Sequence, residues 1–162
     1  MSQHHATFAR CRQAVDVTCA LLGLRPSFPL AALLAALEGV RKRHIFLVET
    51  TTMPHTHTAM TIWTPAHEMI CYRAGFEPAH RRLTICHELG HILGNHPRRE
   101  LPVEVLEDHP DLRALAHDGQ VYICGRTIYD DPIEREAEYM ATYLLSLVTP
   151  TDDALLSSIL QL

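Results

Sequence analysis

The feature that most constrains this chain is the segment His87-Glu88-Leu89-Gly90-His91, an H-E-x-x-H motif. In an α-helix, residues four positions apart lie on one face, one turn above each other. His87 and His91 can therefore direct two imidazole nitrogens at a single metal ion, and Glu88 can reach a neighbouring water molecule as a general base. So short a pattern also arises by chance. The metal-site interpretation therefore requires that the surrounding residues form a helix and that another part of the chain provides a third ligand.

The residues around the motif predict a helix over about 79–95. Its apolar positions recur at intervals of three and four, as expected for a stripe that faces a core. These positions are Leu83, Cys86, Leu89 and Leu93. Asn95 and Pro97 end the predicted helix. His87 and His91 lie on a neighbouring stripe, where both can face a metal ion.

A catalytic zinc site needs a third protein ligand and an open position. In one extension of the motif, a third histidine follows the second by six residues, but Pro97 occupies that position here. His96 lies one residue short, at the end of the predicted helix, with the wrong rotation for a ligand. Cys86 and Cys124 are further candidates, although buried thiols more often serve packing.

A glutamate from a second helix is the alternative that the sequence favours. Asp131 and Pro132 begin a predicted helix that extends to about residue 148, and Glu134 lies in its first turn. Small residues on both helices would let them approach closely; they are Gly90, Gly94, Ala137 and Ala141. We therefore predict a metal site that consists of His87, His91 and Glu134.

Glu134 has a second interpretation. Asp131-x-x-Glu134 also matches a capping box, in which the glutamate folds back onto the start of its own helix. Beside the H-E-x-x-H motif, we favour the metal ligand. Glu138, one turn further along, is expected to accept a hydrogen bond from the outer nitrogen of a ligand histidine.

A hydrolytic site would also need a donor for the negative charge that develops during the reaction. The side chains with suitable chemistry are Tyr129, Tyr139, Tyr143 and His117. A strand at about 68–73 is a candidate edge for pairing with an extended peptide. The irregular connection over 98–120 has two interpretations, a functional lid or a tolerated surface insertion.

The remaining pattern predicts one α+β domain over residues 1–162. Before the motif, the predicted elements are helices at about 7–22 and 27–40 and strands at about 45–50, 59–64 and 68–73. The last two strands are expected to be antiparallel, and Trp63 is expected to be a core anchor, with substrate contact as the alternative. After the motif, we expect a short helix following Pro110, a short strand at about 121–124 and a final helix starting near Thr151.

Composition narrows the class of protein. The formal net charge of -5 argues against electrostatic capture of nucleic acid. The apolar run over 30–37 is far shorter than the ~20 residues that span a bilayer, and the start of the chain lacks a signal-peptide pattern. Five scattered cysteines without a C-x-x-C pair predict reduced, mostly buried thiols. We expect a cytoplasmic protein without membrane contact or direct nucleic-acid binding.

With these residues in place, the chain resembles the ImmA/IrrE family of metallopeptidases. The resemblance rests on residues 86–96 (CHELGHILGNH) and 133–145 (IEREAEYMATYLL). It implies a zincin-like minimal metallopeptidase domain with N-terminal helices, a small three-stranded, mostly antiparallel sheet, and a motif helix packed on a second ligand-bearing helix. It also implies that the three predicted ligands bind Zn²⁺ and that Glu88 is the general base. Glu138 stands where the family pattern has Asn or Asp, and Met140 where it has Phe.

The resemblance implies a function in transcription regulation or stress response. Members of this family cleave repressor-type DNA-binding regulators, so the expected substrate is a helix-turn-helix repressor or similar regulator, cut in trans. The chain has no helix-turn-helix pattern of its own, so such a partner would be a separate protein. The alternative from another class is a non-proteolytic, zinc-containing module that binds a regulator without cutting it.

Overall fold

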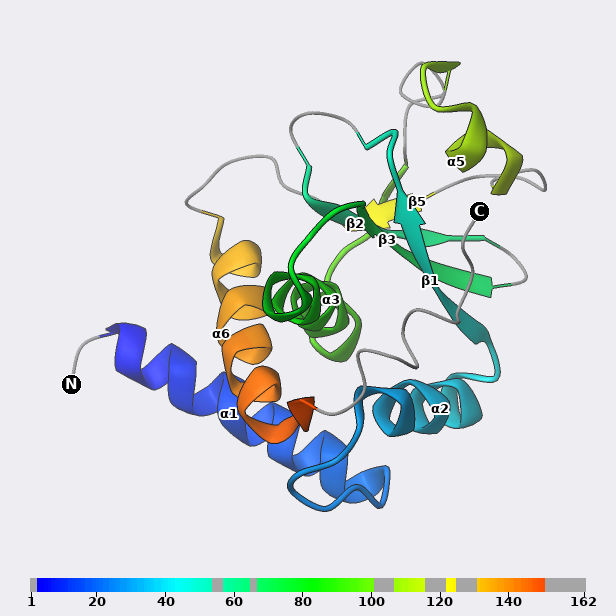
Figure 1. The fold of residues 1–162 in the computed structure, drawn as a ribbon. Helices are drawn as coiled ribbons and strands as arrows, with labels where there is room; N and C mark the ends of the chain where they lie inside the picture. Colours follow the sequence, from blue (N-terminus) through cyan, green and yellow to red (C-terminus); the bar gives the residue numbers. More distant parts are fainter. Residues whose placement is uncertain are drawn as a thin grey trace.

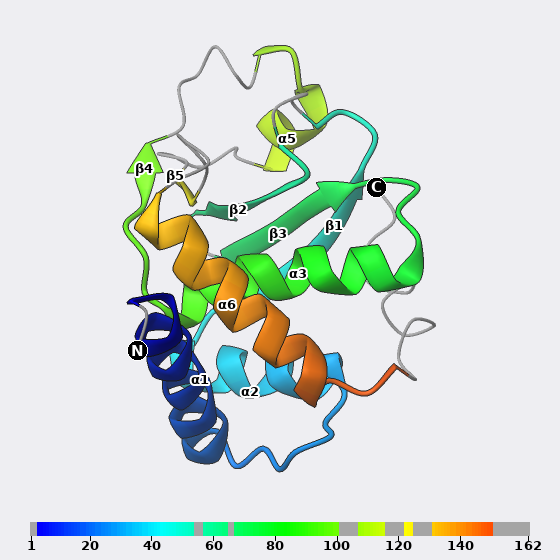
Figure 2. The ribbon, with the colours of Figure 1, turned by 90° about the vertical axis from the view of Figure 1, so that its left-hand side faces the viewer.

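The computed structural model of the protein describes residues 3–53, 57–64, 67–100, 107–115, 122–124 and 131–150. The helices are α1 (Gln3–Leu21), α2 (Leu30–Arg41), α3 (Pro78–Leu93), α5 (Pro110–Leu115) and α6 (Pro132–Leu147). Helix α3 lies against the β-sheet, α6 crosses α3 on the side away from the sheet, and α1 packs against α6 (Figure 1). Figure 2 shows this crossing face-on. The H-E-x-x-H helix is therefore held between the sheet and the helix that carries Glu134.

The strands form one mixed sheet. They are β1 (His44–Thr50), β2 (Ala59–Trp63), β3 (His67–Arg73), β4 (Arg99–Glu100) and β5 (Tyr122–Cys124). Their order is β1-β3-β2-β5-β4, with β1 parallel to β3 and the other neighbours antiparallel. The antiparallel pairing of β2 with β3 is confirmed. The sheet is larger than the predicted three-stranded one, because β4 and β5 extend it beyond β2.

The expectation that the strand at 68–73 is a sheet edge was wrong. Strand β3 lies inside the sheet, between β1 and β2. Its outer side is covered by β1 along the whole strand, in a parallel register that runs from His44 opposite His67 to Thr50 opposite Arg73. Its backbone groups are therefore committed to both neighbours, and an added peptide strand cannot pair there.

The first helix follows its sequence signals closely. Helix α1 buries Cys11, Val15 and Cys19, which recur at intervals of four. It ends before Gly23, whose φ of 71° is a left-handed conformation that glycine adopts without strain. It begins at Gln3, earlier than the predicted start near residue 7, because the preceding turn contains no helix breaker.

The connection over residues 98–120 contains two short elements. The predicted helix after Pro110 is confirmed as α5. Strand β4 was not predicted, because two residues are too few to show an alternating pattern. Residues 101–106 and 116–120 lie outside the described residues, as does the helix predicted from Thr151. The lid and the surface insertion therefore both stay predictions.

The sheet carries buried side chains on both faces, because successive strand residues point in opposite directions. In β2, Ala59 and Trp63 join the core beneath the helices, whereas Met60 and Ile62 join a second cluster on the other face. Trp63 is 3% exposed and lies beneath the guanidinium of Arg98, 4.7 Å from the ring centroid. The prediction that Trp63 is a core residue is confirmed.

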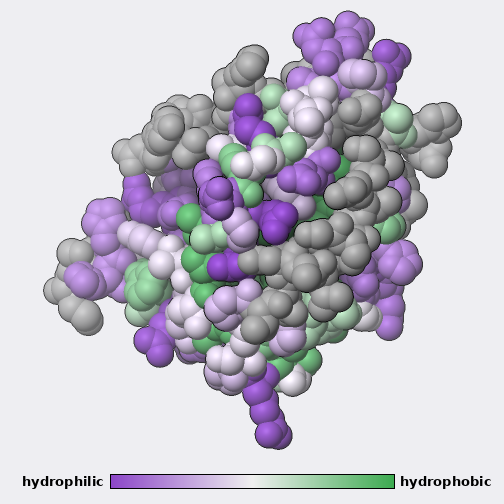
Figure 3. All heavy atoms as spheres, in the orientation of Figure 1, coloured by the Kyte–Doolittle hydropathy of each residue, from purple (hydrophilic) through white to green (hydrophobic). Residues whose placement is uncertain are grey.

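Few large hydrophobic side chains of the described residues are exposed. On the face drawn in Figure 3, hydrophobic residues reach the surface only in small areas among hydrophilic ones. Exposed large hydrophobic side chains among the described residues are Val17, Leu21 and Val40. None of the described helices combines the length and the apolar character that crossing a membrane requires.

Candidate metal centre

The site is built where α3 and α6 touch. A Cβ atom added to Gly90 would lie 2.8 Å from the carbonyl oxygen of Ala137 and 3.2 Å from its Cα. Only glycine leaves room for the backbone of α6 at this point. Ala137 and Ala141 are fully buried on the facing side of α6. The predicted close approach through small residues is therefore confirmed at Gly90.

At Gly94, the nearest side chain is that of His96, which belongs to the same segment of the chain. A Cβ atom added to Gly94 would lie 2.5 Å from Nε2 of His96. The chain turns back immediately after α3, so the ring of His96 occupies the space beside Gly94. The small residue at this position makes room for a side chain of its own segment.

The three predicted ligand residues come together between the two helices. Nε2 of His87 lies 3.2 Å from Nε2 of His91 and 3.3 Å from a carboxylate oxygen of Glu134. The other oxygen of Glu134 lies 3.6 Å from Nε2 of His91. Tetrahedral ligand atoms of a zinc ion lie about 3.3 Å apart, given ligand bonds of about 2.0–2.1 Å. The site that consists of His87, His91 and Glu134 can therefore hold a metal ion.

The start of α6 separates the two interpretations of Glu134. The side chain of Asp131 caps the helix, because its carboxylate accepts a hydrogen bond of 2.9 Å from the backbone N–H of Ile133. The carboxylate of Glu134 lies against the two histidines instead. The carboxylate of Asp131 thus caps the helix, and the carboxylate of Glu134 is available to bind a metal ion.

Charge within the site favours an ionised Glu134. Partial burial opposes its ionisation, but the contacts with His87 and His91 outweigh burial and hold the pKa of Glu134 well below its usual range. Burial also acts against protonation of His87, yet the contact with Glu134 and the nearby carboxylates raise the pKa of His87. The two histidines now stabilise the negative charge of Glu134. A divalent metal ion bound between these groups would stabilise that charge instead.

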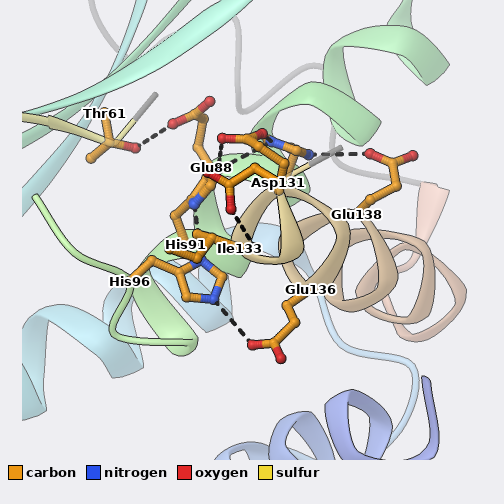
Figure 4. A network of polar contacts seen from close by, with 10 residues as sticks. Thr61, Glu88, His91, His96, Asp131, Ile133, Glu136 and Glu138 are labelled. Carbon is orange, nitrogen blue, oxygen red and sulfur yellow. Dashed lines mark hydrogen bonds and ion pairs between the residues drawn. The ribbon is translucent and has the colours of Figure 1, made fainter. Parts of the chain in front are cut away.

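Glu88 lies beside this site, on the side of the sheet. It is 4% exposed, and one of its oxygens accepts a hydrogen bond of 2.7 Å from the hydroxyl of Thr61 on β2 (Figure 4). Burial raises the pKa of Glu88, although the two nearby histidines act in the opposite direction. The sequence pattern did not predict a role for Thr61. The feature that could have indicated one is that Thr61 is the only polar residue of the otherwise apolar strand β2.

Each histidine of the site uses Nε2 toward the site and has a second residue at Nδ1. Nδ1 of His87 lies 3.2 Å from a carboxylate oxygen of Glu138, the residue predicted for such a contact. Nδ1 of His91 lies 2.9 Å from Nδ1 of His96. His96 is therefore not one of the three ligand residues, but it touches one of them. The sequence pattern, which disfavours His96 as a ligand, indicates no other role for it.

Two of the predicted charge-stabilising donors lie away from the site. The hydroxyl of Tyr139 is 3.2 Å from Nδ1 of His4, and the hydroxyl of Tyr143 donates a 2.6 Å hydrogen bond to Asp16. Both contacts are with α1, because these positions lie on a face of α6 that is rotated away from Glu134. The other two candidates, His117 and Tyr129, lie outside the described residues.

The geometry gives no support to Cys86 as an alternative ligand. Cys86 is fully buried in the core beneath the helices, and burial raises the pKa of its thiol to about 12. Among the described residues, the group that could hold a metal ion consists of His87, His91 and Glu134 and does not include Cys86. Cys124 lies in β5. Cys11, Cys19 and Cys71 are buried free thiols, as the composition predicts.

No family model, curated protein or solved structure was found to match this chain. The resemblance to the ImmA/IrrE family therefore rests on the two sequence segments that carry it. What the geometry adds is independent of that family: two imidazoles and a buried glutamate from α3 come together with a carboxylate from α6.

Proposed function

We propose that the protein is a zinc-dependent endopeptidase that resembles the ImmA/IrrE family. The observation that carries the proposal is the convergence of His87, His91 and Glu134, with the buried Glu88 beside them. Two histidines and one glutamate are the protein ligands of several catalytic zinc sites, which keep a fourth position open. Among the described residues the site has three ligand residues, whereas a structural zinc site usually has four, and this difference favours catalysis.

In the proposed reaction, zinc, Glu88 and Thr61 each have a separate role. Zinc, when bound, supplies a Lewis acid that polarises a carbonyl group and lowers the pKa of water to about 7. Glu88 accepts a proton from the attacking water and returns it to the leaving amine. Burial supports this role, because it shifts the pKa of Glu88 upward, toward the range in which a carboxyl group both takes and releases a proton. Thr61 holds one oxygen of Glu88 by a hydrogen bond, so we assign the proton transfer to the other oxygen.

We further propose that the substrate is a separate protein regulator, of the helix-turn-helix repressor type, cut in trans. The support is the sequence resemblance, together with the absence of a helix-turn-helix pattern in this chain. The formal net charge of -5 favours a protein partner over direct binding of nucleic acid.

The test compares three proteins. We expect wild-type protein to carry about one zinc ion, measured by mass spectrometry of the metal, and to cleave a repressor-type regulator encoded beside its gene. Glu88→Gln should keep the zinc and lose cleavage, and Glu134→Ala should lose both. Glu77→Gln is the matched control, because Glu77 is exposed at the start of α3 and its side chain makes no capping hydrogen bond.

Two results would reject the proposal. If wild-type protein binds no zinc, the metal site is absent. If Glu88→Gln cleaves as fast as wild type, Glu88 is not the base. Zinc binding together with regulator binding but without cleavage would instead support the non-proteolytic module.

A further inference from the structure

The end of α3 folds His96 back over His91. Asn95 has a left-handed backbone, with φ of 48°. The N–H of His96 donates to the carbonyl oxygen of His91 at 3.0 Å, and the N–H of Asn95 donates to that of Ile92 at 3.2 Å. These two hydrogen bonds define a Schellman motif, the commonest way of closing a helix with a left-handed residue. The motif places the side chain of His96 directly against the turn that contains His91.

The contact between the two rings is buried and close. His91 is 2% exposed and His96 is 8% exposed. Their Nδ1 atoms lie 2.9 Å apart, and Gly94 leaves the space that the ring of His96 fills (Figure 4). A Schellman motif usually has a hydrophobic contact at these two positions. Here two imidazoles replace it, so the contact is polar where an apolar one is usual.

The chemistry of imidazole fixes the direction of this hydrogen bond. A neutral imidazole has one N–H donor and one acceptor nitrogen, so one ring donates and the other accepts. If Nε2 of His91 binds a metal ion, its proton must sit on Nδ1, and Nδ1 of His96 must accept. The remaining N–H of His96 then lies on Nε2, which is 3.7 Å from a carboxylate oxygen of Glu136. Glu136 in turn accepts a 2.7 Å hydrogen bond from Arg10 on α1.

We propose that His96 is a positioning residue of the metal centre, which holds His91 with Nε2 directed at the metal. Glu136 lies 3.7 Å from Nε2 of His96 and is itself paired with Arg10, so the N-terminal helix adjoins the site through this ion pair. This inference rests on the proposed metal binding and deepens it. At the other ligand, His87, the residue in the position equivalent to His96 is Glu138. The side chain of Glu138 is 58% exposed, whereas that of His96 is 5% exposed. The buried partner keeps a single orientation better than the exposed one.

The test uses two substitutions of nearly equal size. In His96→Asn, the amide oxygen can accept the proton on Nδ1 of His91, and in His96→Leu nothing can. Zinc affinity is measured by competition with a chromophoric chelator for wild type and both variants. We expect His96→Leu to bind zinc about 10- to 100-fold more weakly than wild type, and His96→Asn to stay within about fivefold.

The stability of the metal-free proteins separates positioning from packing. Leucine suits a buried position better than asparagine, so a purely structural role predicts that His96→Leu is the more stable variant and binds zinc at least as well. Equal zinc affinities of the two variants, or tighter binding by His96→Leu, would overturn the proposal. Failure of wild-type protein to bind zinc would overturn the proposed function and this inference together.

Discussion

The hydroxyl of Thr61 donates a 2.7 Å hydrogen bond to a carboxylate oxygen of Glu88, and both residues are almost fully buried. This hydrogen bond links the sheet to Glu88, which is the one acidic residue of the H-E-x-x-H helix α3. Because Thr61 lies on the helix-facing side of β2, the strand presents a polar group where its neighbours Ala59 and Trp63 present apolar ones. The orientation of Glu88 therefore depends on the sheet as well as on its own helix.

Removal of this hydroxyl should destabilise the protein. We expect Thr61→Val, which keeps the shape of the side chain, to lower the free energy of unfolding by about 1–3 kcal/mol, because Glu88 would be left buried without its donor. The measurement is urea unfolding at neutral pH. Thr50→Val is the matched control, since Thr50 is also a buried strand threonine but its hydroxyl contacts Thr52.

A double-mutant cycle with Glu88→Ala assigns the loss to this pair. In the absence of the carboxylate, Thr61→Val should cost less, and the difference is the coupling energy. An equal cost in both backgrounds would show that the hydroxyl of Thr61 does not stabilise Glu88.

The contact of α3 with α6 predicts opposite effects for two glycine substitutions. Gly90→Ala should lower the free energy of unfolding by about 1–3 kcal/mol, because its Cβ would lie 2.8 Å from a backbone oxygen of Ala137. It should also weaken zinc binding, since α6 carries Glu134. Gly39→Ala is the matched control: Gly39 lies in α2 with no atom near its Cβ position, so alanine should stabilise by about 0.5–1 kcal/mol. Two substitutions with the same sign would contradict the close approach at Gly90.

Stability should fall at alkaline pH because of Cys71. Burial raises the pKa of this thiol from 9.0 to about 12. The unfolded state therefore loses the thiol proton at lower pH than the folded state, and the stabilisation that is complete below pH 9 declines as the pH rises toward 12. The decline is at most about 1.4 kcal/mol per pH unit for one thiol.

Urea unfolding between pH 8 and 10.5, in a reducing buffer, measures this slope. Cys71→Ala should show a shallower decline than wild type over the upper part of the range. Cys86 has a similarly raised pKa, so part of the slope should remain in the variant. Identical slopes for the two proteins would mean that Cys71 does not titrate differently on unfolding.

Removal of zinc should lower the thermal stability of wild-type protein. A ligand at about 1,000 times its dissociation constant stabilises by about 4 kcal/mol, which corresponds to roughly 10 °C in Tm for a domain of this size. The measurement compares Tm after chelator treatment with Tm after zinc is restored. Glu134→Ala should show little response to zinc, and an unchanged Tm for wild type would argue against the site.

Local sequence patterns were enough to predict the part of the site that lies on single helices. Helical periodicity places His87 and His91 on one face, with Glu88 beside them, because the backbone hydrogen bonds of a helix fix which side chains are neighbours. The same local logic located the helix that carries Glu134 and its cap at Asp131, and small residues such as Gly90 indicated that two helices could meet closely. These predictions depend on residues that are a few positions apart, so pattern alone could make them.

The contacts of these groups depend on how the helices and the sheet pack together. Periodicity gives the faces of a helix but not their neighbours, so Tyr139 and Tyr143 were candidates until the packing of α6 on α1 turned them away from the site. In the same way, the parallel pairing of β1 enclosed β3, and only the assembled sheet brought Thr61 to Glu88. The role of His96 depends on a left-handed turn that reverses the chain onto its own helix. Contacts of this kind arise from packing between distant segments, which no local pattern specifies.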